Sequence, residues 1–239
     1  MKAVRLLASA EIVLHDALVS DEILALVNPA ATLIDIGKRR GHKLLTQSEI
    51  NSLLIAYAAK ANNVIRLKGG DPSIFGRAGE EIEALVEAGV AYEIVPGITS
   101  ALASAAAAGI SLTDRRFAAS VLFTTGHRAS EAESVQWNRL VTAGTTLVIY
   151  MPGTDYSEIA ASLVDAGLHS TTPCTIVSQA SRPTQSVLHT HLATLISHEA
   201  LPAPALLIVG ECAAPLHFSA ELSESIRDRE TKTQEGAVA

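Results

Sequence analysis

Residues 63–79, NVIRLKGGDPSIFGRAG, combine residue types that could hold a ligand. An apolar stretch ends at the paired glycines Gly69 and Gly70, which let a backbone approach a ligand closely. Asp71 could accept hydrogen bonds from that ligand, and Arg77 could hold a carboxylate through two parallel bonds. The segment has neither the Lys-Ser/Thr of a P-loop nor the spacing G-x-G-x-x-G, so it fits neither nucleotide fingerprint. A tight turn that opens a helix at the Asp-Pro pair explains the same residues equally well.

Two charged residues each follow a short apolar stretch and could transfer protons. Asp16 could act as a general base where it is partly desolvated. Lys38 could donate a proton or fix an anion. Each also has a structural interpretation, because aspartate is common in turns and caps and most loop lysines are solvated. No Ser-His-Asp elbow, C-x-x-C pair or metal-ligand spacing is present in the sequence, so we expect no metal site and spacing alone defines no reaction.

Arginines gather in the predicted loops although the net charge of the chain is −7. The acidic balance argues against general nucleic-acid binding, which needs a basic surface. A locally positive cleft could still attract a polyanionic small molecule. The alternative is that several of these arginines pair with surface carboxylates. The arginines in question are Arg39, Arg40, Arg77, Arg115, Arg116 and Arg128.

The composition and pattern predict the elements that position these residues. Hydrophobic residues make up 48% of the chain and aromatics only 4%, which is typical of buried parallel strands covered by helices. Strands and helices alternate in two successive series, so we predict an α/β fold with an N-terminal domain at 1–113 and a C-terminal domain at 114–216. The polar residues 217–239 predict a disordered tail. A cleft between the domains is the expected site.

Local signals in the sequence add further expectations. Residues 64–67 and 92–95 are predicted strands, and Thr46 with Glu49 predicts a capping box before a helix at 50–59. The first residues have a helical pattern. No apolar run reaches the roughly 18–20 residues that span a membrane, so we expect no membrane association. Cys174 and Cys212 are expected to be buried thiols of a cytoplasmic protein.

Six segments occur in an order that resembles a known family. They are HDALVS (15–20), IGKRRGH (36–42), RLKGGDPSIFGRAGEE (66–81), VPGITSALA (95–103), TGHR (125–128) and YMPG (150–153). Together they resemble the uroporphyrinogen-III C-methyltransferases of the tetrapyrrole methylase family, from Lys2 to about Glu211. The resemblance implies two α/β domains, S-adenosylmethionine in the cleft between them, and a homodimer. It also implies methylation of uroporphyrinogen III at C2 and C7, giving precorrin-2 for sirohaem or cobalamin synthesis.

The resemblance also implies roles for individual residues. By motif, Asp16 corresponds to the family's proton acceptor and Lys38 to its proton donor. Arg39, Arg40, Arg77 and Arg128 are our hypothesis for the residues that bind the eight substrate carboxylates. Ala180 stands where the family usually has a cofactor-contacting glycine. The expected cofactor contacts are Gly69, Gly70, Asp71, Ile74, Thr99, Ser100, Met151 and Ala180.

The resemblance has one departure. Family members begin with a strand and a GAGPGDP-type loop that covers part of the cofactor, and this sequence begins after both. A truncated start and a degenerate member with weak cofactor binding are both compatible with this. Two other functions therefore stay open: methylation of a later precorrin, and an inactive paralogue that only dimerises or binds a tetrapyrrole.

Overall fold

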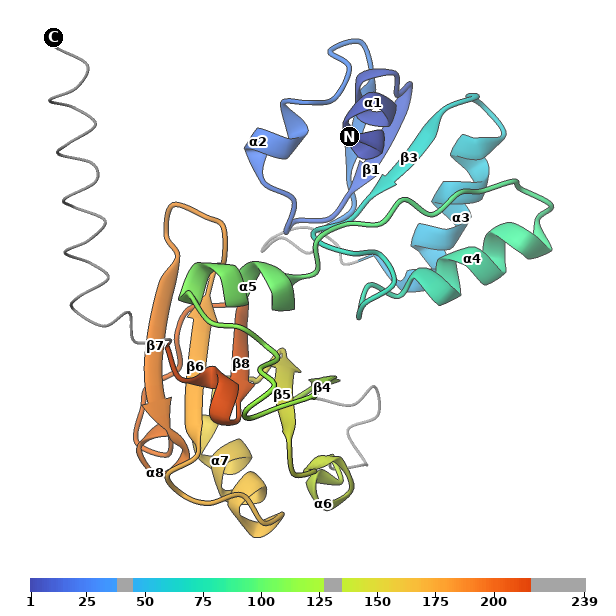
Figure 1. The fold of residues 1–239 in the computed structure, drawn as a ribbon. Helices are drawn as coiled ribbons and strands as arrows, with labels where there is room; N and C mark the ends of the chain where they lie inside the picture. The colour runs from blue at the N-terminus through green and yellow to red at the C-terminus, as the bar shows by residue number, and fades with distance from the viewer. Residues whose placement is uncertain (38–44, 127–134, 216–239) are drawn as a thin grey trace, which may run out of the picture. The chain divides into compact units, whose positions relative to one another are not determined.

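The computed structural model describes residues 1–37, 45–126 and 135–215 (Figure 1). Two compact units make up the chain, Met1–Ala103 and Ser104–Ala239. Each unit contains its own β-sheet with helices, which confirms the predicted α/β class. The predicted domain ranges, with their boundary after residue 113, stay a prediction. The predicted tail at 217–239 lies outside the described residues.

The first unit is built on a parallel three-stranded sheet with the strand order β2-β1-β3. Because His15 is in register with Asp35 on one side and with Leu67 on the other, the carboxyl ends of the three strands are level. The loops that leave these ends are therefore neighbours. The elements of this unit are α1 (Lys2–Ala8), β1 (Ile12–His15), α2 (Asp21–Leu24), β2 (Thr32–Asp35), α3 (Gln47–Ala58), β3 (Val64–Leu67) and α4 (Ala78–Glu87).

Helices cover both faces of this sheet. Leu7 of α1 packs with Val13 of β1 in one apolar cluster. Leu54 of α3 packs with Leu14 of β1 in another, and Leu85 of α4 joins that second cluster. Adjacent strand residues point to opposite faces, so the apolar run of β1 fills both clusters. The predicted capping box at the start of α3 is confirmed, since Thr46 and Glu49 exchange side-chain to backbone hydrogen bonds.

The strand predicted at 92–95 is wrong. Residues 91–99 form no strand, and no strand of the described residues pairs with them. Tyr92 and Ile94 are instead exposed, at 47% and 46%. A β-type residue pattern produces a strand only where a neighbouring strand supplies hydrogen bonds and packing. The segment leads to Gly97, which contacts the glycine loop described below.

The second unit has a mixed five-stranded sheet with the strand order β4-β5-β8-β6-β7. One face packs on α6, α7 and α8 around Tyr156, Leu163 and Leu192. The short helix η1 contacts β5, β6 and β8, and Thr175 of β6 donates a hydrogen bond to the carbonyl of Ala213 at 2.5 Å. Helix α5 (Ser100–Ala108) contains the point where the first unit ends and the second begins. The other elements of the second unit are β4 (Ser120–Thr125), α6 (Trp137–Leu140), β5 (Thr145–Tyr150), α7 (Tyr156–Asp165), β6 (Pro173–Ser178), β7 (Ser186–His191), α8 (Leu192–Leu195), β8 (Ala205–Val209) and η1 (Glu211–Ala213).

Candidate active site

The loops after β1, β2 and β3 touch one another at the level edge of the first sheet. A Cβ atom on Gly37 would lie 2.2 Å from the backbone nitrogen of Ala17, and one on Gly69 would lie 3.1 Å from Leu18 Cβ. Glycine is therefore required at residue 37 and favoured at residue 69 for the loops to approach this closely. The structure thus places the loop that begins at Asp16 beside the residue that precedes Lys38 and beside the glycine loop. Lys38 itself lies outside the described residues.

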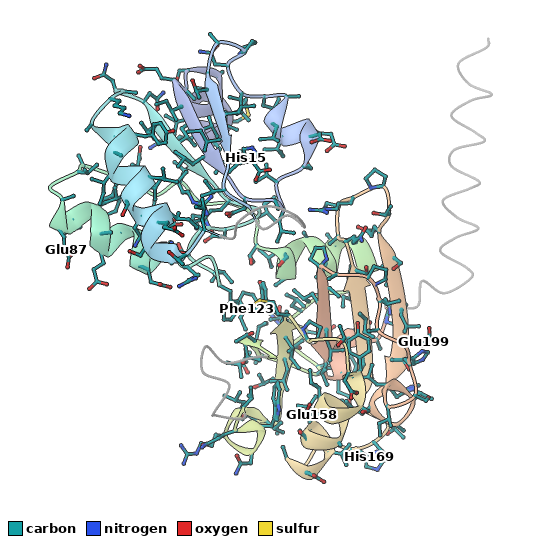
Figure 2. All side chains as sticks on the ribbon, turned by 180° about the vertical axis from the view of Figure 1, so that it is seen from behind. His15, Glu87, Phe123, Glu158, His169 and Glu199 are labelled. Atoms are coloured by element: carbon teal, nitrogen blue, oxygen red, sulfur yellow. The ribbon has the colours of Figure 1, made fainter. Side chains whose placement is uncertain are left out.

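Asp16 lies at the start of its loop with a partly exposed carboxylate. Its side chain is 33% exposed, and Arg66 Nη2 donates to Asp16 Oδ1 at 2.5 Å. His15, labelled in Figure 2, is buried at the end of β1, and its Nδ1 lies 3.3 Å from the Asp16 carbonyl oxygen. A carboxylate held on one side by a guanidinium and partly open to solvent could accept a proton from a bound molecule.

The glycine loop after β3 is joined to the segment that precedes α5. Asp71 Oδ2 accepts a hydrogen bond from the Gly97 backbone N–H at 3.0 Å, and its Oδ1 accepts one from Ser73 N–H at 2.8 Å. These donors, Gly97 first, lower the pKa of the Asp71 carboxyl below its ordinary value. The carboxylate of Asp71 therefore holds the chain's own loops together, which the sequence did not predict.

This junction brings several predicted cofactor residues close together. Gly70 has φ of 122° and its missing Cβ would lie 4.0 Å from Thr99 Cα and from Ser100 N. Thr99 is buried and Ser100 is the first residue of α5. Ile74 is in the same loop, and its N–H donates to the Asp71 carbonyl at 3.3 Å. The backbone groups and small residues of these two loops could surround part of a nucleoside-like ligand.

Arg77 forms a local ion pair. Its Nε and Nη2 donate to the two carboxylate oxygens of Glu80, both at 2.7 Å. The Glu80 hydrogen bond raises the pKa of Arg77, and the Arg77 hydrogen bond lowers the pKa of Glu80. Both side chains are more than half exposed. Since solvent screens exposed ion pairs and they contribute little to stability, another carboxylate could replace Glu80 at small cost.

In the second unit, the predicted cofactor residues follow strand ends and lie at or beside residues with left-handed backbone conformations. Met151 follows β5 with φ of 49°, and its carbonyl would lie 2.7 Å from a Cβ on Gly126. Ala180 follows β6 between Gln179 and Ser181, whose φ values are 52° and 65°. Left-handed conformations of non-glycine residues cost on the order of 1–3 kcal/mol and cluster at ligand-binding sites. These two loops are therefore candidates for ligand contact.

Three of the four predicted substrate arginines, Arg39, Arg40 and Arg128, lie outside the described residues. Arg116 binds the carboxylate of Asp114 through two hydrogen bonds of 3.0 and 2.8 Å, which lowers the pKa of Asp114 to about 2. Arg116 thus takes the alternative role of a surface ion pair. Within residues 1–37, 45–126 and 135–215, no group of three or more His, Cys, Asp or Glu side chains could hold a metal, and no helix has the length and hydropathy to cross a membrane.

The sequence analysis did not identify a buried group of charged side chains that adjoins Asp16. It consists of Arg66 and Lys68, which lie at and just after the end of β3, and Glu81 from the first turn of α4. Their signal was present in the sequence, because charges alternate with apolar residues in VIRLK, where an entirely apolar strand would be expected.

A glycine-rich loop at the carboxyl ends of parallel strands in the first unit, and strained loops after β5 and β6 in the second, are typical of an α/β protein that binds a small molecule. Residues 1–196 match the family model of the Tetrapyrrole (Corrin/Porphyrin) Methylases. The chain belongs to this family.

Curated relatives include siroheme synthases. The chain is 44% identical over 215 residues to that of Actinobacillus succinogenes and 46% identical over 215 residues to that of a Psychrobacter species. These matches cover 88% and 89% of this chain but only 44% of each relative. The chain therefore spans less than half the length of these curated relatives.

Solved structures of similar length also match. The uroporphyrin-III C-methyltransferase of Thermus thermophilus, complexed with S-adenosyl homocysteine, has a TM-score of 0.76 and is 36% identical, covering 88% of this chain and 90% of that one. A cobalt precorrin-4 methyltransferase has a TM-score of 0.73 at 26% identity, covering 90% of both chains. The fold and the family are thus shared with methyltransferases that act on tetrapyrroles.

Proposed function

We propose that this chain transfers methyl groups from S-adenosylmethionine to C2 and then C7 of uroporphyrinogen III, which gives precorrin-2. The observation that carries the proposal is the 36% identity with the Thermus thermophilus uroporphyrin-III C-methyltransferase over 90% of that chain. Precorrin-2 would serve the synthesis of sirohaem or cobalamin. The siroheme synthase relatives support the first of these pathways.

S-adenosylmethionine would be held by the loops of both units. The described residues fit it, because the glycine loop and the segment before α5 offer backbone groups and the strained Met151 carries an exposed thioether. Gly69, Gly70 and Ile74 would contact it in the first unit with Thr99 and Ser100. Met151 and Ala180 would contact it in the second. Asp71 would act mainly by keeping the glycine loop against Gly97.

The protein's own part in the reaction is alignment and proton transfer. The sulfonium supplies an activated methyl group, so a pyrrole carbon forms the new bond to carbon as the bond from sulfur to methyl breaks. The methylated tetrapyrrole then carries a positive charge and must lose a proton. Asp16, which Arg66 orients, would accept that proton, and Lys38 would return a proton where the macrocycle needs one.

Arginines would hold the substrate through its carboxylates. Arg77 could exchange Glu80 for a substrate carboxylate without a large energetic cost, since its present pair is exposed. Arg39, Arg40 and Arg128 complete the proposed set. We further propose that the protein is a cytoplasmic homodimer and needs no metal, nucleic acid or membrane. Light scattering at micromolar concentration would test the dimeric state.

Anaerobic incubation of the chain with uroporphyrinogen III and S-adenosylmethionine, read by product mass, tests the function. A gain of two methyl groups is expected. No gain with uroporphyrinogen III but a gain with precorrin-2 or a later precorrin would contradict the proposed substrate and favour the later-precorrin alternative. Binding of uroporphyrinogen III without any methyl transfer would favour an inactive paralogue.

A further inference from the structure

Four charged side chains alternate in sign in a series that begins with Asp16, the proposed proton acceptor. Arg66 Nη2 donates to Asp16 Oδ1 at 2.5 Å, and Arg66 Nε donates to Glu81 Oε1 at 3.1 Å. Lys68 Nζ lies 2.9 Å from Glu81 Oε2. Arg66 and Lys68 are two positions apart in an extended segment, so both point to the face of the sheet on which α3 and α4 pack. In order of contact, the four charges are Asp16, Arg66, Glu81 and Lys68.

Exposure falls from Asp16 through Arg66 to Glu81, and Lys68 on the other side of Glu81 is also largely buried. The side chain of Asp16 is 33% exposed and that of Arg66 is 14% exposed, whereas Lys68 and Glu81 are 9% and 5% exposed. A buried carboxylate is costly unless it is paired and hydrogen-bonded. Glu81 meets this condition through Arg66, Lys68 and the side-chain amide of Gln47 at 3.3 Å.

The guanidinium of Arg66 is fixed at three nitrogens. Nε is bound to Glu81, Nη1 donates to the Leu67 carbonyl at 3.0 Å, and Nη2 reaches Asp16. Since a guanidinium is planar and its donors form a rigid fork, fixing Nε and Nη1 determines where Nη2 lies. Lys68 also donates a hydrogen bond to the Gly76 carbonyl at 2.5 Å, and this bond connects the Lys68 end of the series to the glycine loop.

We propose that Glu81 is a positioning residue for the reaction: it fixes Arg66, and Arg66 in turn fixes the carboxylate of Asp16 toward the substrate. Lys68 balances the charge of Glu81 and links this arrangement to the loop that would contact the cofactor. The inference rests on the proposed function, in which Asp16 accepts a proton. A proton acceptor must lie within about 2.6–3.2 Å of the atom that it deprotonates, and a misplacement of 1 Å can cost about 10²-fold in rate.

Glu81→Gln tests this role because glutamine has the shape of glutamate without its charge. We expect kcat for methylation of uroporphyrinogen III to fall about 10–100-fold, while its KM and the Kd of S-adenosylmethionine stay within about twofold. Glu83→Gln is the matched control, since Glu83 is exposed on the same helix and should leave all three constants unchanged. Unchanged kcat in folded Glu81→Gln would overturn the proposal.

A double-mutant cycle separates positioning from a merely structural effect. If Glu81 acts through Asp16, then Glu81→Gln should lower kcat no further in an Asp16→Asn background. A further fall equal to that in the wild type would overturn the proposal. Should Glu81→Gln unfold the protein, Glu81→Gln with Lys68→Met keeps the local charge balanced, and the same fall in kcat is expected of it.

A second readout does not depend on activity. In ¹⁵N and ¹³C NMR spectra, Glu81→Gln should speed the exchange of the Arg66 Nε proton and shift the carboxyl carbon of Asp16, whereas Glu83→Gln should change neither. If the wild type transfers no methyl group, the proposed function fails, and the Asp16 carboxyl shift still decides the positioning link. An Asp16 shift that is identical in wild type and Glu81→Gln overturns that link.

Discussion

Replacing Gly97 with alanine should separate the two loops that Asp71 joins. A Cβ atom at Gly97 would lie 2.4 Å from the Gly70 carbonyl oxygen and 3.0 Å from its carbonyl carbon. It would also lie 3.4 Å from Asp71 Cα. Since these are all backbone atoms, no side-chain rotation can relieve the overlap. The loops must move apart, and the hydrogen bond from Gly97 N–H to Asp71 Oδ2 would lengthen or break.

The expected decrease in the free energy of unfolding of Gly97→Ala has two parts. Overpacking of this kind costs about 1–3 kcal/mol. A hydrogen bond to a charged acceptor contributes about 1.5–3 kcal/mol, and the accessible position of Asp71 places its bond at the low end. The free energy of unfolding should therefore fall by about 2.5–4.5 kcal/mol. If the same loops bind S-adenosylmethionine, its Kd should rise at least about tenfold, which corresponds to about 1.4 kcal/mol.

Urea unfolding and titration calorimetry would measure the two effects. Gly79→Ala is the control, because a Cβ at this position in α4 meets nothing within 4 Å. Its helical propensity should leave stability unchanged or raise it by up to about 1 kcal/mol. If Gly97→Ala stayed within about 0.5 kcal/mol of the wild type and bound S-adenosylmethionine equally well, the close junction of the two loops would be refuted.

Three further predictions concern single groups. The backbone donors Gly97 and Ser73 lower the pKa of the Asp71 carboxyl, so its contribution to stability is present above the unfolded pKa and lost as pH falls through the folded pKa. Protection of the Gly97 amide, corrected for intrinsic exchange, should therefore fall in the wild type only at a pH below the ordinary aspartate pKa, and Asp71→Asn should show no such fall. Burial raises the pKa of Cys174 to about 12, so iodoacetamide at pH 8 should label it only after unfolding, and rapid native labelling would contradict its burial. Arg77→Glu should raise KM for uroporphyrinogen III at least about tenfold, with little change in the Kd of S-adenosylmethionine. Glu80→Gln should lower this KM or leave it unchanged. Equal effects of Arg77→Glu on both ligands would exclude a substrate role for Arg77.

Much of the fold follows from local signals in the sequence. Short apolar strands, the capping box at Thr46 and Glu49, and the alternation of strands with helices predict the α/β class. The prediction failed at residues 92–95, where a good β pattern has no neighbouring strand among the described residues. Strand formation depends on a partner distant in sequence, so no window of residues 91–99 could reveal that outcome.

The sequence predicts the role of the glycines in the candidate site but not the hydrogen-bond partners of the other residues. Paired glycines after a strand indicate close backbone approach whatever lies opposite. The sequence could not show that Gly97 lies opposite the paired glycines. It also could not show that both carboxylate oxygens of Asp71 accept hydrogen bonds from backbone N–H groups of the same chain. Partners 26 residues apart in sequence become neighbours only in the folded chain, so no local pattern reveals the contact.

The buried charges of β3 and α4 suggest a rule that would have found more of the site. A strand covered on both faces is expected to be apolar throughout, so each charge on it requires an opposite charge from another element. Arg66 is such a charge on β3 and Lys68 directly follows the strand, so a buried carboxylate must lie within reach of both. Glu81 in the first turn of the next helix satisfies them together, and the remaining donor of Arg66 reaches Asp16. The charges within an apolar strand therefore point to the carboxylate that the reaction would use.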